Sequence, residues 1–184
     1  MNLRSLSLTA LALGSLGRQA QEGPRFGLQA TLSLPQGDLK DAVDSKMGYG
    51  VGAHVTFDLQ GGHMIRPRLD ATWYPKYTVS DAFGSASVTY SNLSLGADYL
   101  YFVEGKPQGL YFTGGLSAVQ WKGEASVNVL GISGSDSETT TKLGLAAGLG
   151  YQFNKTVGAE LRYQTSKVWD GNANSLQAGV TFRF

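Results

Sequence analysis

Hydrophobic and polar residues alternate along nearly the whole chain from residue 25 onward. Near the C-terminus, for example, Leu176, Ala178 and Val180 occupy every second position, and polar residues or glycine stand between them. A period of two is the signature of a β-strand whose two faces meet different surroundings. Segments of this kind recur at about 25–34, 48–59, 65–76, 89–102, 109–121, 140–153, 156–166 and 175–184. We therefore predict an all-β chain with eight strands.

The connections between these segments alternate in length. Short ones lie near 60–64, 103–108 and 154–155, and longer ones, rich in Gly, Ser, Asp and Asn, lie near 35–47, 77–88, 122–139 and 167–174. Tilted strands of about ten residues cross a bilayer, and short turns on one side with long loops on the other are typical of outer-membrane barrels. The longest loop contains an apolar run at 127–132, which either extends a hairpin above the membrane or presents an apolar surface to a partner.

The position of glycine decides which face of the strands points inward. A soluble barrel of the lipocalin kind shows the same alternation, with its apolar face inside. In this chain glycine shares a face with the charged residues, although glycine weakens a strand and a water-facing surface does not need it. The lumen of an eight-stranded barrel does need it, because the lumen is only wide enough for side chains to fill. We therefore predict a closed, antiparallel, up-and-down transmembrane β-barrel with its apolar face outward and a polar, glycine-rich lumen.

Charged and ionisable residues of both signs share the inward face. They are Arg25, His54, Asp58, Arg66, Arg68, Asp70, Asp98, Lys142, Glu160, Arg162 and Arg183. Hairpin registers estimated from the turns bring Asp58 near Arg25 and Arg66, and Asp98 near Arg68. Buried charges cost several kcal/mol each unless they are paired and hydrogen-bonded. The pattern favours a salt-bridge network that plugs the lumen over a polar conduit for protons or small ions.

Aromatic residues gather at the two ends of the expected strands. One expected girdle contains Phe26, Phe57, Tyr101, Phe112, Phe153 and Phe184, and the opposite one contains Trp73, Trp121 and Trp169. Amphipathic rings favour the interface between membrane and water, so two girdles fit a spanning barrel. Pro67 does not fit easily within the third strand, because it has no N–H to donate to a ladder. Either the strand begins after Pro67 or a bulge accommodates it.

The N-terminus has the pattern of an export signal. Arg4 precedes the apolar run 6–16, which is too short to span a bilayer, and small residues precede a cleavage site after Gly17 or after Ala20. We expect residues 1–20 to be removed and 22–184 to form the barrel domain.

Composition excludes several classes of function. The chain has no Cys, so a disulfide framework, a thiol nucleophile and a thiolate metal site are impossible. A net charge of +1 gives no footprint for nucleic acid. Of the two histidines, His54 is expected inside the barrel as a hydrogen-bonded lumen residue and His63 in a short turn. Neither stands beside a nucleophile or in a cluster with metal-ligand spacing, so we expect no catalytic residues, metal or cofactor.

The signal segment, the eight amphipathic strands and the terminal Phe182-Arg183-Phe184 carry a family resemblance. The chain resembles the small outer-membrane β-barrels of the outer membrane protein A and X type, including the opacity-protein-like barrels. The resemblance implies the outer membrane of a Gram-negative bacterium, and recognition of Phe182 and Phe184 by the barrel-assembly machinery.

Because no nucleophile stands beside a base, we expect a non-enzymatic, monomeric protein with a structural or surface-interaction role. Outer-membrane lipid, including lipopolysaccharide, is the expected partner, and five lysines near the expected outer rim are candidates to bind its phosphates: Lys40, Lys46, Lys76, Lys122 and Lys167. The alternatives are a narrow, porin-like channel for ions or small solutes, a lipid-modifying enzyme, and a soluble lipocalin-like binder of small hydrophobic ligands.

Overall fold

The computed structural model describes residues 23–80, 84–129, 132–168 and 171–184. The expected signal segment, its cleavage sites and Trp169 lie outside these residues. The described chain forms β1 (Arg25–Gln36), α2 (Asp38–Ala42), β2 (Gly48–Asp58), β3 (His63–Trp73), β4 (Tyr77–Ser80), β5 (Gly84–Phe102), β6 (Gly109–Val129), β7 (Ile132–Gln152), β8 (Val157–Val168) and β9 (Gly171–Arg183).

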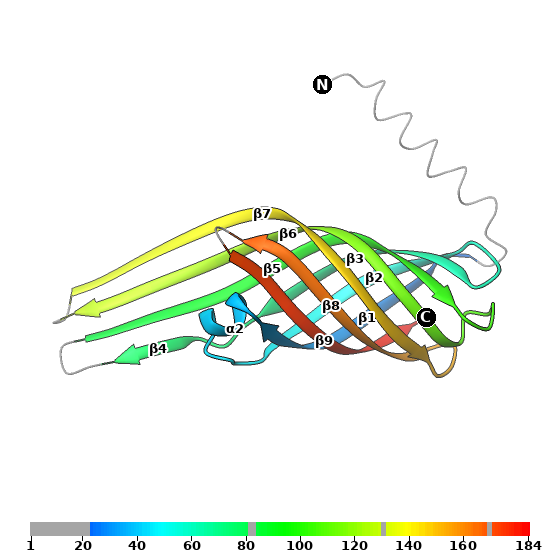
Figure 1. Cartoon of the computed structure of the whole chain (residues 1–184), viewed down its shortest axis with the longest axis horizontal. Helices are drawn as coiled ribbons and strands as arrows, with labels where there is room; N and C mark the ends of the chain where they lie inside the picture. The colour runs from blue at the N-terminus through cyan, green and yellow to red at the C-terminus, as the bar shows by residue number, and fades with distance from the viewer. Residues whose placement is uncertain (1–22, 81–83, 130–131, 169–170) are drawn as a thin grey trace, which may run out of the picture.

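Eight of the strands form a closed ring in which every neighbouring pair is antiparallel (Figure 1). The order runs β3-β2-β1-β9-β8-β7-β6-β5, and a β3–β5 pairing closes the circle. β4 is an additional short strand that pairs only with β5. It follows Pro75, whose missing N–H ends the ladder of β3 before pairing with β5 resumes at Tyr77. The predicted eight-stranded antiparallel barrel is thus confirmed.

Two of the long connections are strand where loop was expected. β6 and β7 remain paired from Gly109↔Gln152 to Val129↔Ile132, so 122–139 is the outer part of a hairpin. β5 begins at Gly84 instead of 89 and pairs with β6 as far as Gly84↔Val129. The outer parts of β5, β6 and β7, with β4, therefore project as an arm beyond the ring, on the left of Figure 1. In the third long connection, 35–47, the short helix α2 interrupts the expected loop.

Apolar side chains point away from the lumen. Leu28, Leu95 and Leu143 expose 52%, 64% and 68% of their surface, whereas their polar neighbours Gln29 and Ser94 are buried. A Cβ at Gly150 would collide with the ring of Tyr111, which shows how tightly the lumen is filled. A soluble barrel with an apolar interior does not fit this arrangement.

Pro67 is accommodated in a way that was not expected. It lies within β3 and pairs with Ala97 of β5. On the β2 side the register is the same at His54↔Arg68 and at Phe57↔Ile65, but the two pairs between them are missing from the ladder. The strand therefore neither begins after Pro67 nor bulges there. It passes through with a local gap in its bonding to β2, because proline has no N–H to offer.

The aromatic residues at the end of the barrel that carries the short turns face outward. Phe26, Tyr101, Phe112, Phe153 and Phe184 are exposed and Phe57 is half-buried. At the opposite end Trp73 is 40% exposed and stacks on Tyr49 with ring centroids 6.0 Å apart.

Candidate functional site

Asp98 of β5 is the centre of a buried group of charges in the middle of the lumen. Its Oδ2 accepts hydrogen bonds from Arg66 at 2.8 Å and from Arg68 at 2.9 Å, both on β3, and from Arg162 of β8 at 3.0 Å. Its side chain is 1% exposed. Three guanidinium groups from two strands thus converge on one carboxylate oxygen.

Glu160 of β8 is the second buried acceptor. A guanidinium nitrogen of Arg66 lies 2.7 Å from its Oε2, Arg68 lies 3.6 Å from its Oε1, and the Tyr111 hydroxyl of β6 donates to its Oε2 at 2.9 Å. Arg66 therefore bridges the two buried carboxylates.

Asp70 extends the network along β3. It pairs with Arg68 at 2.6 Å and accepts a hydrogen bond from the Gln29 side chain of β1. We name Arg66, Arg68, Asp70, Asp98, Glu160 and Arg162 the central ion-pair cluster. Beside it lies a cavity of about 10 Å³, lined among others by Gln29, Glu160 and Thr181, which is about the space of one water molecule. The cluster joins the neighbouring strands β3 and β5 to β8 on the far side of the ring.

Three expected lumen residues stand outside this cluster. Asp58, expected near Arg25 and Arg66, accepts a hydrogen bond from the backbone N–H of Gln60 in the adjoining turn, at 2.7 Å. Lys142 has the inward phase but is exposed, because it lies beyond Gly144↔Ser166, where β7 and β8 cease to pair. Arg25 is half-buried at the start of β1.

His54 and Arg183 are buried but differ from the cluster in their partners. Neither ring nitrogen of His54 has a hydrogen-bond partner among the described residues, so the expectation of a hydrogen-bonded histidine is wrong. Arg183 lies over the Phe102 ring at 5.8 Å, and within the described chain its Nε and one terminal nitrogen have no partner. Both residues pair in register with Gly27, so they flank it on neighbouring strands.

Apolar residues fill the lumen on both sides of the central ion-pair cluster. Toward the short turns, Met64, Leu100, Phe102 and Tyr111 form one buried cluster. Toward the arm lies a second one, which we name the mouth cluster; it comprises Leu39, Val43, Tyr74, Val119, Trp121, Val168 and Ala173. α2 contributes Leu39 and its C-cap residue is Val43, so the helix packs into the end of the barrel.

Trp121 corrects the expected outer girdle. It is only 4% exposed, its Nε1 donates to Ser166 Oγ at 3.0 Å, and its ring stacks on Tyr74 at 6.2 Å. The alternation along the strand already predicts an inward Trp121, because residues 117 and 121 are an even number of positions apart and Ser117 points inward. Its place near the end of the strand suggested a lipid contact, but the parity of its position decides its direction.

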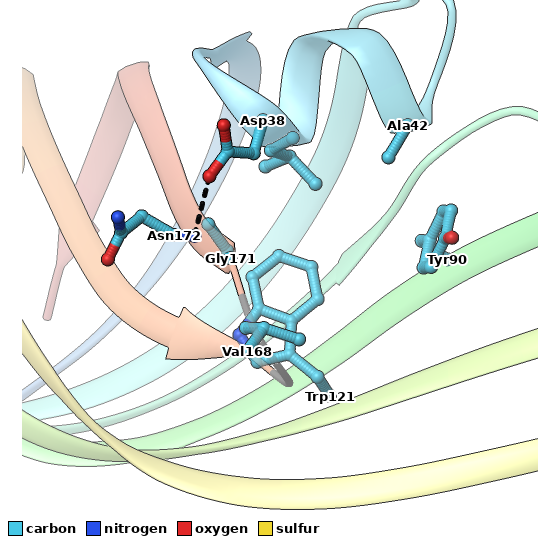
Figure 2. A pocket seen from close by; sticks show the side chains of 9 residues that line it. Asp38, Ala42, Tyr90, Trp121, Val168, Gly171 and Asn172 are labelled. Carbon is cyan, nitrogen blue, oxygen red and sulfur yellow. Dashed lines mark hydrogen bonds between the residues drawn. The ribbon is translucent and has the colours of Figure 1, made fainter.

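A pocket opens above the mouth cluster, between α2 and the arm (Figure 2). Its volume is about 260 Å³, and Leu39, Trp121, Val168 and Ala173 form apolar walls. Asp38 is at its rim, where Oδ2 accepts a hydrogen bond from the backbone N–H of Asn172 at 2.9 Å. This pocket was not predicted from the sequence, because α2 was expected to be loop.

The described residues contain no helix that could span a bilayer; α2 has 5 residues. Within the same residues, His, Asp and Glu do not gather in any group of three that could hold a metal ion. His63, which was expected in a short turn, is instead the first residue of β3, directly after that turn, and its ring contacts Tyr99 and Tyr101 of β5.

Comparison with known proteins places this geometry in a family. A family model described as the outer membrane protein beta-barrel domain matches residues 6–184. A search of curated proteins found no match.

Among solved structures, the attachment invasion locus protein Ail of Yersinia pestis is 17% identical, with a TM-score of 0.61; the match covers 89% of this chain and 100% of that one. A second structure of Ail, in complex with the heparin analogue sucrose octasulfate, matches with 16% identity, a TM-score of 0.57 and coverage of 88% and 96%. A major outer membrane protein of Thermus thermophilus matches with 12% identity, a TM-score of 0.55 and coverage of 89% and 100%. At these identities the likeness concerns the fold.

Proposed function

The chain belongs to the outer membrane protein beta-barrel family and lies in the outer membrane, and from this premise we propose that it is a non-enzymatic barrel with a plugged lumen. Its role is structural or one of surface interaction. The observation that carries the proposal is the convergence of three arginines on Asp98, which joins β3, β5 and β8 across the bore.

Three layers of side chains support a closed lumen. The central ion-pair cluster lies between the apolar cluster around Phe102 and the mouth cluster around Trp121. Moving one of the buried guanidiniums aside would leave a carboxylate uncompensated, which costs about 3–5 kcal/mol. That cost opposes spontaneous opening to ions.

A narrow channel is the alternative that the same cluster raises, because rearranged ion pairs would gate a polar path. The test is conductance of the purified full chain in planar lipid bilayers, for the wild type and for Asp98→Asn. The matched control is Asp136→Asn, which removes an exposed carboxylate from the arm, outside the ring.

We expect no steady single-channel conductance from the wild type or the control. Asp98→Asn is expected to leak, because it loosens the charge group that fills the bore. Steady conductance of the wild type, changed in ion selectivity by Asp98→Asn but not by Asp136→Asn, would overturn the plug and establish the channel. Absence of any difference between the three proteins would show that the cluster does not control the bore.

The arrangement of ionisable groups supports a non-enzymatic role. The histidines lie apart, with His54 inside the lumen and His63 at the start of β3 beside a short turn, so neither activates a nucleophile at the outer lipid surface. Mass spectra of lipids from expressing cells are expected to match those from cells without the protein. A new acylated or deacylated lipid would instead identify a lipid-modifying enzyme.

Outer-leaflet lipid, including lipopolysaccharide, is the partner that we propose for the outer rim. Lys46 donates to the backbone carbonyl of Lys76 at 3.0 Å and lies over the Tyr77 ring, which holds two of the five lysines close together. Lys122 pairs with Glu124, so its charge is partly engaged. Changing Lys40, Lys46, Lys76, Lys122 and Lys167 to Gln is expected to weaken lipopolysaccharide association in a co-sedimentation assay, and unchanged association would contradict the proposal.

Biogenesis completes the proposal. Residues 1–20 act as a signal peptide that is cleaved after Gly17 or Ala20. Phe182 and Phe184 serve as the signal that the barrel-assembly machinery recognises. The mature barrel is a monomer. Both phenylalanines are exposed at the end of β9, where a recognition factor can reach them. N-terminal sequencing of the exported protein decides between the two cleavage sites, and an uncleaved N-terminus would contradict the signal peptide.

A further inference from the structure

The pocket at the mouth of the barrel has an apolar floor that is fixed in place. Trp121 is held by its hydrogen bond to Ser166 and by stacking against Tyr74 at an interplanar angle of 19°. Leu39 and Val168 pack beside it and are buried. Tyr90 stands across from Trp121 on the arm side (Figure 2). A ligand would meet a preformed aromatic surface, which lowers the cost of binding.

Among the described residues that line the same pocket, Asp38 is the charged one. Its carboxylate is positioned by the N–H of Asn172, which occupies one of the roughly four lone-pair sites of a carboxylate. The other described lining side chains with polar atoms are those of Tyr90, Trp121 and Asn172, a phenol, an indole and an amide. The field at the rim therefore favours a cation over an anion.

The pocket does not lead into the lumen. Val119, Tyr74 and Trp121 are buried directly beneath it, and the central ion-pair cluster lies deeper in the barrel. A molecule that enters from outside would be retained at the mouth and would not pass through. The pocket is therefore suited to binding and not to transport.

We propose that this pocket binds a small organic ammonium ion that has an aromatic or compact aliphatic body. The body contacts the Trp121 and Tyr90 side, and the ammonium group lies toward Asp38. A mostly apolar cavity with one convergent polar group is the usual make-up of a small-molecule site. Indole and phenol faces add attraction for a cation, and a carboxylate adds a charge-assisted hydrogen bond. This site is separate from the plug and does not depend on it.

The test compares three probes that differ only in their end group: 2-phenylethylamine, 2-phenylethanol and 3-phenylpropionate. The full chain is refolded into lipid nanodiscs, and tryptophan fluorescence excited at wavelengths where phenyl rings do not absorb reports on Trp121. The double variant Trp73→Phe, Trp169→Phe serves as the background, because Trp121 is then the one tryptophan in the chain, and because Trp73, which faces outward, would respond to probe dissolved in the lipid.

We expect saturable changes with the amine, with an affinity about three- to tenfold above that of the alcohol, and the weakest response with the carboxylate, in line with a single charge-assisted contact at a wet rim. Asp38→Asn keeps an acceptor for Asn172 and removes the charge. It is expected to equalise the amine and the alcohol. The matched control is Asp41→Asn, on the same helix but not lining the pocket, and it is expected to preserve the preference.

A second variant guards against loss of folding. Ala42 lines the pocket and is exposed, so Ala42→Phe fills part of the cavity without disturbing the barrel wall or adding a tryptophan, and it is expected to abolish the saturable response. Retained heat-dependent mobility in SDS shows that this variant is folded. Equal affinity for all three probes, an equal effect of Asp38→Asn and Asp41→Asn, or undiminished binding to folded Ala42→Phe would each overturn the proposal.

Discussion

The middle of the lumen and its mouth both contain inward-facing side chains of the barrel strands, yet they have opposite chemistry. Arg162 and Ser166 of β8 both point inward, but the first joins the central ion-pair cluster and the second accepts from Trp121 of the mouth cluster. Alternation therefore decides which side chains are inside the barrel. It does not decide whether that interior is polar or apolar.

The two regions also depend on different partners. The central ion-pair cluster is contained within the wall of the barrel, because its members all belong to strands of the ring. The mouth cluster needs α2 and its C-cap, which supply Leu39 and Val43 from a connection between strands. We expect the first region to be inseparable from the barrel and the second to be able to open locally while the barrel stays folded.

Removing the centre of the polar region has the largest expected effect. Asp98→Leu leaves three buried guanidiniums without their shared acceptor and should lower the free energy of unfolding by about 3–5 kcal/mol. Urea unfolding in micelles, followed by tryptophan emission, measures it. Asp136→Leu, at an exposed site on the arm, should change stability by no more than about 0.5 kcal/mol. Equal midpoints for the two variants would mean that the cluster is energetically neutral.

Opening the mouth comes next. Leu39→Ala removes buried methyl groups from the α2 contact, a change that costs about 2–5 kcal/mol in a rigid core. Because α2 can undock locally, we expect the loss to appear as faster hydrogen exchange at the Val43 amide and a red shift of Trp121 emission, with the global unfolding midpoint nearly unchanged. Lys40→Ala, on the exposed side of α2, is the control. A full shift of the global midpoint would show that the mouth and the wall unfold together.

The smallest expected effect sharpens the contrast within the polar region itself. Arg183→Met removes a cation–π contact that stabilises the wild type by about 0.5–2 kcal/mol. It also removes buried donors that lack partners within the described chain and that destabilise the wild type by about 1–3 kcal/mol. The two terms offset, so stability should change by about 1 kcal/mol or less. Arg66→Met should cost several times more. Refolded protein is the right sample, because residue 183 lies between the two phenylalanines of the proposed assembly signal. Equal losses for the two variants would place Arg183 in the network.

The strands, their phase and the closed barrel could be predicted from sequence, because period-two patterning over about ten residues is a direct consequence of unlike faces. The arm could not. Residues 133–141 are polar on both faces, so they show no alternation, and their strand structure depends on pairing with β6. Position near a strand end misled the prediction for Trp121, although its parity was informative.

The contacts across the lumen required the three-dimensional registers. The pairing of Asp98 with Arg68 was predicted from neighbouring strands, but Arg162 and Glu160 reach the same cluster from the far side of the ring, where sequence gives no register. His54 has no hydrogen-bond partner in the described chain for a similar reason: its surroundings are set by Gly27 and Arg183, on strands that meet only when the barrel closes.

The length of the β6–β7 hairpin sets a height. β6 has 21 residues, and at about 3.3 Å per residue it is roughly 70 Å long, or roughly 50 Å tall at the usual tilt of a barrel strand. The apolar band of an outer-membrane barrel accounts for about 25 Å of that. Roughly half of the hairpin therefore stands clear of the hydrocarbon, as paired strand and not as a slack loop. Anything that meets its tip does so at a fixed distance from the membrane, beyond the headgroups of the lipids among which the barrel sits.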